Sequence, residues 1–225
     1  MILKLTEKNS FVISINDKRY KLFKKIFNYY QLPLPKLFNG VKHNNPVLGC
    51  LLSHYNILKL ATLWSLPYIF VFEDDVLPNK NIIHYMNEAL KNVPDNFNIL
   101  KLENIYFNNE YDNNILSENN WIKHCKNAPI IGRGTGAIVI NITSSFQLIK
   151  LIEKMIPNIT PIDVILELAN KIFHNFNMYI SKNILFVQHN LHKEKTIHNN
   201  FMNNSLKRIN PNLGIISDFE PNIFE

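Results

Sequence analysis

Residues 68–76 of this chain read Y-I-F-V-F-E-D-D-V, a run of aromatic and β-branched residues that ends in three carboxylates. A short apolar run of this composition is typical of a strand buried on both faces of a parallel sheet. Carboxylates are costly to bring to the end of such a strand unless a cation or a polar network receives them. Because ligands collect at the carboxyl ends of strands in open α/β sheets, Glu73, Asp74 and Asp75 are candidates for a binding site.

Strand geometry and ligand chemistry make this hypothesis more specific. Alternation along an extended chain places Glu73 and Asp75 on one side and Asp74 on the other. Two carboxylates on one side suit a hard divalent ion such as Mn²⁺ or Mg²⁺, which could also hold a diphosphate. The alternative is an acidic turn that merely caps a strand in solvent, and acidic turns are common.

The 225 residues fit one α/β domain, or one domain with a small appendage. We expect a domain over residues 1–190 and a C-terminal extension over residues 191–225. No run approaches the ~20 apolar residues of a membrane span, and the first residues lack the features of a signal peptide, so we expect a cytoplasmic protein. The net charge of +6 favours anionic partners such as nucleotide phosphates or anionic lipids, although scattered lysines also fit a mildly basic surface.

Strand and helix signals alternate along the chain, which predicts an α/β fold. The predicted strands cover residues 11–15, 37–38, 68–72, 99–102, 137–140 and 179–187. The predicted helices cover residues 18–30, a segment that starts at Pro46 and stops before residues 65–67, residues 81–91, residues 144–155 with a Ser144–Gln147 capping box, and a segment opened by Asp163. Residues 106–126 are polar and predict a long loop. Gly132, Gly134 and Gly136 precede a strand rather than a helix, which excludes a dinucleotide-binding fingerprint.

Four short elements now stand in order along the chain. They are G-C-L-L-S-H at residues 49–54, F-E-D-D-V at residues 72–76, G-T-G-A at residues 134–137 and P-I-D at residues 161–163. This order and spacing resembles glycosyltransferase family 25, the lipopolysaccharide and lipooligosaccharide glycosyltransferases that are related to collagen galactosyltransferases. The resemblance runs from about Phe11 to about His189. It implies a GT-A-like domain with a mostly parallel, Rossmann-like central sheet flanked by helices, a UDP-sugar donor, and inverting transfer to a hydroxyl group.

The resemblance also implies roles for individual residues. Asp75 is expected to bind Mn²⁺ or Mg²⁺ directly, Glu73 to contact the metal or the ribose, and His189 to complete the metal site from the last strand. Asp163 is the first candidate for the general base and Glu103 is the second. The other residues expected to contact the nucleotide-sugar are Ser14, Asn16, Arg19, Ser53, His54, Asp74, Arg133, Gly134, Thr135 and Gly136.

Several of these residues have an ordinary structural alternative. An Asp at a helix start is often an N-cap, which is the alternative for Asp163. His54 with Ser53 beside it on a helix is often a satisfied core residue, and Arg133 could form a surface salt bridge instead of facing phosphate. The stretch from Ser14 to Arg19 departs from the arginine-rich pattern of relatives, so contacts to uracil and ribose are open there.

Two other functions fit parts of the pattern. A nucleotidyltransferase that makes sugar nucleotides could use similar acidic ligands, but it would favour a glycine-rich loop after the first strand, and residues 14–20 contain no glycine. A non-catalytic carbohydrate-binding relative would be expected to lose the acidic triplet, which is intact. The leading hypothesis is transfer of galactose or glucose to a surface glycan or glycolipid, in a bacterium or a large virus. We expect peripheral membrane contact and no nucleic-acid partner, and the sequence leaves the oligomeric state open.

Overall fold

The computed structural model describes residues 2–103, 117–118, 120–127 and 134–188. Its strands are β1 (Ser10–Ser14), β2 (Lys36–Asn39), β3 (Tyr68–Glu73), β4 (Val76–Pro78), β5 (Ile99–Lys101), β6 (Ser117–Glu118), β7 (Trp121–Lys123), β8 (Ala137–Asn141), β9 (Met178–Ser181) and β10 (Phe186–Gln188). Its helices are α1 (Asp17–Tyr29), α2 (Pro46–Leu63), α3 (Ile82–Lys91), α4 (Ser145–Met155) and α5 (Ile162–Ile172), with single 3₁₀ turns at Ile142–Ser144 and Ile156–Asn158.

Eight strands form one mixed sheet in the order β2-β1-β3-β8-β5-β9-β7-β6. β1 pairs in parallel with β2 and β3, and β5 pairs in parallel with β9. β8 runs antiparallel between β3 and β5, and β7 runs antiparallel between β9 and β6. The other six strands therefore share one direction, which confirms the expected α/β fold with a mostly parallel central sheet.

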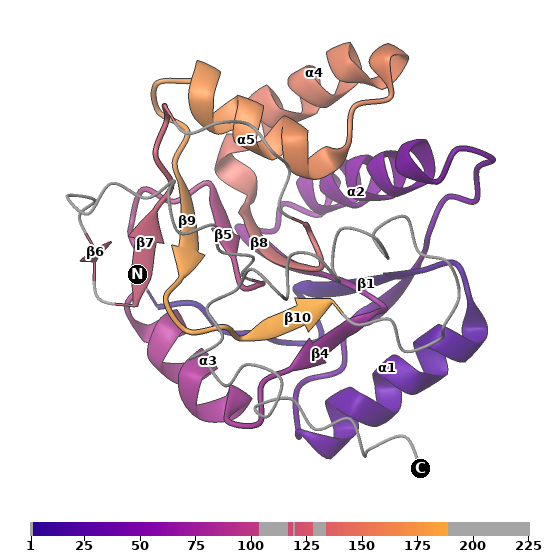
Figure 1. The fold of residues 1–225 in the computed structure, drawn as a ribbon, viewed down its shortest axis with the longest axis vertical. Helices are drawn as coiled ribbons and strands as arrows, with labels where there is room; N and C mark the ends of the chain where they lie inside the picture. Colours follow the sequence, from indigo (N-terminus) through magenta and orange to yellow (C-terminus); the bar gives the residue numbers. More distant parts are fainter. Residues whose placement is uncertain (1, 104–116, 119, 128–133, 189–225) are drawn as a thin grey trace, which may run out of the picture.

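Helices cover both faces of this sheet, with α1 and α3 on one face and α2, α4 and α5 on the other (Figure 1). Alternation along β3 explains why both faces are apolar, because Phe70 and Phe72 join the core under α1 and α3 while Ile69 and Val71 join the core under α2, α4 and α5. All four side chains are fully buried. The sequence run that predicts the fold is thus an inner strand of the sheet, between β1 and β8.

A second, two-stranded ribbon lies beside the main sheet. β10 pairs antiparallel with β4, and Gln188 faces Val76 in its register (Figure 1). The prediction of one continuous strand over residues 179–187 is therefore wrong, because the chain leaves β9 after Ser181 and returns as β10 in the other sheet. This crossing brings the end of β10 back to the acidic triplet.

Two further expectations about local structure are corrected. Asp74 and Asp75 form a turn between β3 and β4, so strict alternation of the three carboxylates fails. The predicted Ser144–Gln147 capping box is also wrong, because Asn141 caps a 3₁₀ turn that already contains Ser144, and the Ser144 hydroxyl donates to the Asn141 carbonyl. At residues 74–75 the strand is followed by a turn where the pattern predicts extended chain. At residues 142–144 a 3₁₀ turn precedes α4.

Some expectations lie outside the described residues. These are the roles of Arg133 and His189, the C-terminal extension over residues 191–225, and residues 106–116 and 119 of the predicted loop. The described remainder of that segment contains β6 and β7, so the prediction of a loop over residues 106–126 is wrong there. Within the described part of the chain, none of the helices is both long enough and apolar enough to cross a membrane.

Candidate functional site

The candidate site residues converge because several strands end at the same edge of the sheet. β1 and β3 run in parallel and end at Ser14 and Glu73, and Glu103 follows β5, which runs in the same direction. β8 runs the other way, so the residues before it, 134–136, reach the same edge. Hydrogen bonds from Glu73 N to the Gly136 carbonyl and from Glu103 N to the Ala137 carbonyl join these segments. We call Glu73, Asp74, Asp75, Glu103 and Asp163 the acidic edge.

Glu73 is the most connected carboxylate of the acidic edge. Its Oε1 accepts a hydrogen bond of 2.8 Å from the Thr135 hydroxyl and lies 3.4 Å from His54 Nε2. Its Oε2 accepts a hydrogen bond of 3.1 Å from the Gln188 amide. The Cys50 Sγ lies 4.0 Å from Oε1. Both oxygens of Glu73 are thus oriented by side chains from α2, the start of β8 and the end of β10.

Asp74 and Asp75 share one cation. The Arg19 guanidinium contacts Asp74 Oδ1 at 2.5 Å and Asp75 Oδ2 at 3.1 Å, and the Ser14 hydroxyl donates to Asp74 Oδ2. Asn16 caps α1 by accepting from the backbone N–H groups of Lys18 and Arg19, which fixes the helix turn that carries this arginine. The Asp75 Oδ1 atom is buried and has no hydrogen-bond partner among the described residues.

Glu103 is almost fully buried, with 2% of its surface exposed. Its Oε2 accepts a short hydrogen bond of 2.7 Å from Gly136 N, and its Oε1 has no partner within the described part of the chain. A Cβ atom on Gly136 would lie 2.7 Å from Glu103 Oε2 and 2.9 Å from Val76 Cγ1, so no other residue fits there without displacement. The glycine before β8 therefore allows the backbone to approach the carboxylate closely.

Asp163 reaches the same site from the first turn of α5. Its Oδ2 accepts a hydrogen bond of 3.1 Å from Gly134 N, and its Oδ1 accepts one of 2.9 Å from Val164 N. The N-cap position of α5 belongs to Pro161, so Asp163 is not the N-cap that the alternative interpretation assumed. Gly134 adopts a φ of +74°, a conformation that glycine takes without strain.

The residues of the 49–54 motif lie on two different faces of α2 and contact different neighbours. Gly49 and Ser53 face the loop after β2: the Ser53 hydroxyl accepts from Val41 N and donates to the Gly49 carbonyl, and a Cβ on Gly49 would lie 2.7 Å from the Val41 carbonyl oxygen. Cys50 and His54, one helical turn apart, face Glu73 instead. Ser53 thus fixes the helix against its neighbouring loop, while His54 contacts the acidic edge.

Burial and mutual repulsion dominate the electrostatics of this edge. Burial, followed by the negative charge of Glu73, raises the pKa of Asp75 to about 7, although Arg19 opposes the shift. Burial and the charges of Glu73 and Asp75 raise the pKa of Glu103 to about 8. The same causes, in the order burial, Glu73, Asp163 and Asp75, raise the pKa of the Cys50 thiol well above its usual value. A cation at this edge would relieve all of these shifts.

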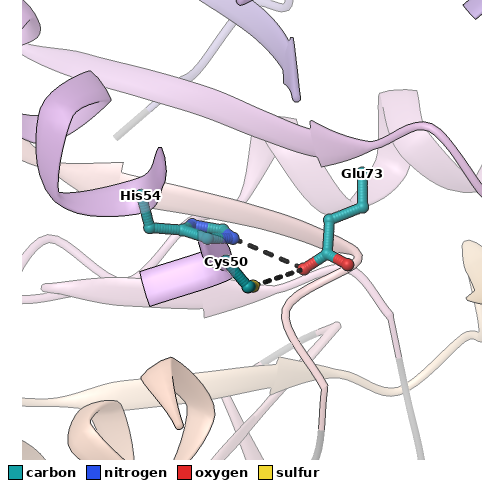
Figure 2. Close-up of side chains that lie close together, drawn as sticks. All are labelled: Cys50, His54 and Glu73. Carbon is teal, nitrogen blue, oxygen red and sulfur yellow. Dashed lines mark hydrogen bonds and ion pairs between the residues drawn. The ribbon is translucent and has the colours of Figure 1, made fainter. Parts of the chain in front are cut away.

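One set of three His, Cys, Asp or Glu side chains in the described residues places its ligand atoms within 4.8 Å of one another, and it comprises Cys50, His54 and Glu73 (Figure 2). Asp75 is not part of this set. A Mg²⁺ or Mn²⁺ ion usually takes one or two carboxylates and completes its sphere with water and substrate phosphates, and the partnerless Asp75 Oδ1 fits that use.

Most residues singled out from the sequence do meet at this edge. Their contacts form neighbouring groups: Ser14 and Arg19 contact Asp74 and Asp75, His54 and Thr135 contact Glu73, Gly136 contacts Glu103, and Gly134 contacts Asp163. The Asn16 and Ser53 side chains instead bond to backbone groups of nearby helices and loops. Sequence reasoning missed Gln188 and gave no role to Cys50. The four-residue spacing of Cys50 and His54 on one helix could have indicated that Cys50 faces the same site. Gln188 could not have been found, because nothing in the sequence indicates that β10 pairs with β4.

Comparisons with known proteins identify the family of this chain. A family model described as glycosyltransferase family 25 (LPS biosynthesis protein) matches residues 13–166. A crystal structure of a glycosyltransferase involved in the glycosylation of the major capsid of PBCV-1 is similar at 11% sequence identity and a TM-score of 0.46, over 88% of this chain and 95% of that one. No curated protein matches. Because the family model covers more than half of the sequence, including every carboxylate of the acidic edge, this chain belongs to glycosyltransferase family 25.

Proposed function

We propose that this glycosyltransferase uses a divalent cation, Mn²⁺ or Mg²⁺, and transfers a hexose from a UDP-sugar to a saccharide hydroxyl with inversion at the anomeric carbon. The observation that carries the proposal is a pair of buried oxygens, Asp75 Oδ1 and Glu103 Oε1, that have no hydrogen-bond partner among the residues that the structure describes. They lie on an edge that already holds the carboxylate of Glu73. Buried carboxyl oxygens are costly unless a cation or a hydrogen-bond partner reaches them. A nucleotide-sugar with its metal supplies both.

Asp75 is the proposed direct ligand of the cation, with Glu73 as its neighbour. Arg19 holds the other Asp75 oxygen and thereby leaves Oδ1 directed away from the guanidinium. The Thr135 hydroxyl and the Gln188 amide fix the orientation of Glu73, so its carboxylate loses little entropy when a ligand binds. A bound divalent cation would neutralise the diphosphate and the charge that develops on the leaving UDP.

Asp163 is the proposed general base, which takes the proton of the acceptor hydroxyl as that oxygen attacks the anomeric carbon. Its carboxylate is half-buried, and two backbone N–H groups hold it in position. Glu103 is less suited, because it is 2% exposed and its pKa of about 8 keeps it protonated at neutral pH without a cation. Glu103 would then orient the Gly134–Gly136 segment beside the donor.

The first experiment measures UDP release from UDP-galactose and UDP-glucose, with Mn²⁺, with Mg²⁺ and after EDTA treatment. Slow hydrolysis that needs the metal and accelerates with a saccharide acceptor supports the proposal. The anomeric configuration of the product, read by NMR, tests inversion. Release that continues in EDTA would refute the metal dependence, and pyrophosphate formation from UTP and a sugar phosphate would point to a nucleotidyltransferase instead.

A second experiment separates the two candidate bases. Asp163→Asn is expected to lower kcat by about 10²–10⁴-fold, the usual contribution of a general base, with KM for the donor almost unchanged. Asp95→Asn, at an exposed position, is the matched control. If Asp163→Asn retains full activity and Glu103→Gln does not, the two roles are reversed.

We further propose that the acceptor belongs to a surface glycan or glycolipid and that the enzyme approaches a membrane peripherally. The family description names lipopolysaccharide biosynthesis, and α1 exposes lysines at positions 18, 21 and 25 on one face. Flotation with anionic and with neutral vesicles tests this contact. Binding to anionic vesicles that salt removes and that Lys21→Glu weakens is the expected result, and equal binding to both vesicle types would contradict it.

A further inference from the structure

Cys50, His54 and Glu73 form a cluster that the proposed sugar transfer does not fully use. Two of its members come from one face of α2 and the third from the end of β3, and their side chains point toward one another (Figure 2). The cluster mixes a thiol, an imidazole and a carboxylate. That donor set suits Zn²⁺, whereas Mg²⁺ and Mn²⁺ favour oxygen ligands.

The distance between His54 and Glu73 fits two ligands of one metal ion better than it fits a hydrogen bond. His54 Nε2 lies 3.4 Å from Glu73 Oε1 and Cys50 Sγ lies 4.0 Å from the same oxygen. A normal N–H···O hydrogen bond is about 2.7–3.2 Å long. Around a tetrahedral Zn²⁺ with metal–ligand bonds of about 2.0–2.3 Å, neighbouring ligand atoms lie about 3.3–3.6 Å apart. The imidazole is already at that separation from the carboxylate, and a small rotation of the cysteine would bring in the sulfur.

The buried imidazole is under-satisfied, which is the second observation. His54 is 3% exposed, its Nδ1 has no hydrogen-bond partner among the described residues, and its Nε2 makes only the long contact with Glu73. Buried polar nitrogens are normally paired. The nitrogen directed at the carboxylate oxygen is Nε2, which has only this long contact there.

The surrounding charge and the rigid backbone favour a dication here. The carboxylate of Glu73 lies beside both Cys50 and His54, and Asp75 and Asp163 belong to the same acidic edge, so the local negative charge attracts a metal ion. Gly49 and Ser53 fix this turn of α2 against the Val41 loop, so Cys50 and His54 are held before any metal arrives.

We propose that Cys50, His54 and Glu73 form a binding site for Zn²⁺ or a similar thiophilic ion, separate from the Mn²⁺ or Mg²⁺ position at Asp75. Zn²⁺ would replace the thiol proton, which passes to the buffer, and the three protein ligands leave a fourth position for water or a substrate oxygen. Because Glu73 is shared, Zn²⁺ at this site inhibits sugar transfer. The binding stands independently of the proposed function, and the inhibition rests on it.

Cobalt substitution tests the binding directly. Co²⁺ added to the EDTA-treated full chain is expected to give a sulfur-to-cobalt charge-transfer band and tetrahedral d–d bands, which Zn²⁺ abolishes by displacement. Cys50→Ser should lose the charge-transfer band and weaken Zn²⁺ binding at least about tenfold. Cys125→Ser, which changes the other free cysteine, is the matched control and should keep both. A wild-type protein without the band, or a band that survives Cys50→Ser and disappears in Cys125→Ser, overturns the proposal.

A second variant guards against misfolding, and a kinetic assay tests the inhibition. His54→Gln keeps the thiol and should still weaken Zn²⁺ binding at least about tenfold, with circular dichroism confirming the fold. Zn²⁺ should lower Mn²⁺-supported UDP release in the wild type more than in Cys50→Ser, each compared with its own zinc-free rate. Equal inhibition in both refutes regulation through this site. Absent UDP release beside an intact cobalt spectrum refutes the proposed function alone.

Discussion

The polar side chains at the two ends of the inner strands differ in how completely they are hydrogen-bonded. At the amino ends of β5 and β9 lies an asparagine edge formed by Asn96, Asn98, Asn141 and Asn177. Asn177 N donates to Asn98 Oδ1 at 2.6 Å, the Asn177 amide donates to the Asn96 carbonyl, and the Asn141 amide donates to the Phe97 carbonyl. None of the buried side-chain atoms of these asparagines lacks a partner within the described chain.

At the acidic edge, by contrast, the polar groups are charged and incompletely paired. Asp75 Oδ1, Glu103 Oε1 and His54 Nδ1 are buried without a partner among the described residues. A fold stabilised by its polar groups satisfies them, as the asparagine edge does. Oxygens left without partners at the opposite edge carry an energetic cost that a bound ligand would offset. The contrast separates polar residues that stabilise the sheet from those that serve chemistry.

The largest expected effect is on activity at the acidic edge. Asp75→Asn removes the proposed metal ligand and should lower metal-dependent UDP release at least about 100-fold, since a lost metal contact is worth several kcal/mol of transition-state stabilisation. Its melting temperature should stay the same or rise, because the charge removed is one that burial and Glu73 disfavour. Steady-state kinetics and thermal unfolding measure the two outcomes. Activity within tenfold of the wild type would remove Asp75 from the site.

The second expected effect is a pH dependence of stability that originates at the acidic edge. The pKa of Glu103 is about 8 in the folded protein against 4.5 as its ordinary value, and that of Asp75 is about 7 against 3.8. Between these values the folded, metal-free protein holds protons that the unfolded chain has released. The contribution of these two carboxyl groups to stability is therefore fully present near pH 4 and falls by roughly a few kcal/mol as the pH rises toward about 8.

Urea unfolding of EDTA-treated protein across this pH range measures that slope. Glu103→Gln should flatten it, and the exposed Glu88→Gln should leave it unchanged. Mn²⁺ should stabilise the protein more at about pH 8 than at about pH 5, because it binds the ionised carboxylates. A slope that Glu103→Gln does not alter would show that Glu103 ionises normally, and the contrast between the two edges would then lose its electrostatic basis.

The third expected effect is on stability at the asparagine edge. Asn98→Ala removes the acceptor of Asn177 N and should lower the free energy of unfolding by about 1–3 kcal/mol, the cost of a buried donor left unpaired. Transfer activity per folded molecule should not change, because the residue lies at the far end of the strand. Asn56→Ala, at an exposed position of α2, is the control and should be neutral or slightly stabilising. A loss of kcat in Asn98→Ala would show that the two edges are coupled.

Local sequence patterns were sufficient for the strands and helices that form this sheet. The run at residues 68–72, the Asn45–Pro46 start of α2 and the glycines before β8 each follow from short-range chemistry, and the structure has them as expected. Local sequence patterns fail where the contact of a residue depends on a partner far away in the sequence. Gln188 reaches Glu73 because β10 pairs with β4, and Arg19 is held by Asp74 and Asp75 across a sequence separation that no local pattern encodes.

The acidic edge shows the same limit within a few residues. Strand alternation predicts that Glu73 and Asp75 lie on the same side of the strand. Instead the chain turns at Asp74 and Asp75, and these two aspartates both contact Arg19. Which carboxylate lacks a partner depends on that turn and on Gly136 approaching Glu103, which are tertiary features. The types of residue in the site could be predicted, and the distribution of hydrogen bonds among them could not.

The smallest expected effect tests how rigid the acidic edge is. Asn45 caps α2 by accepting from Val47 N and Leu48 N, and α2 carries Cys50 and His54 one and two turns further on. Asn45→Ala should lower the free energy of unfolding by about 1 kcal/mol, and Asn45→Asp, which keeps the acceptor, should restore most of it. Urea midpoints and kcat are measured on both variants. Ser53 and Gly49 independently fix this part of α2 to the Val41 loop. We therefore expect kcat to change less than twofold, which corresponds to at most ~0.4 kcal/mol in activation free energy. A much larger fall in kcat, restored by Asn45→Asp, would show that the helix start itself positions the residues around Glu73, and the acidic edge would then depend on its helix cap as much as the asparagine edge depends on its own hydrogen bonds.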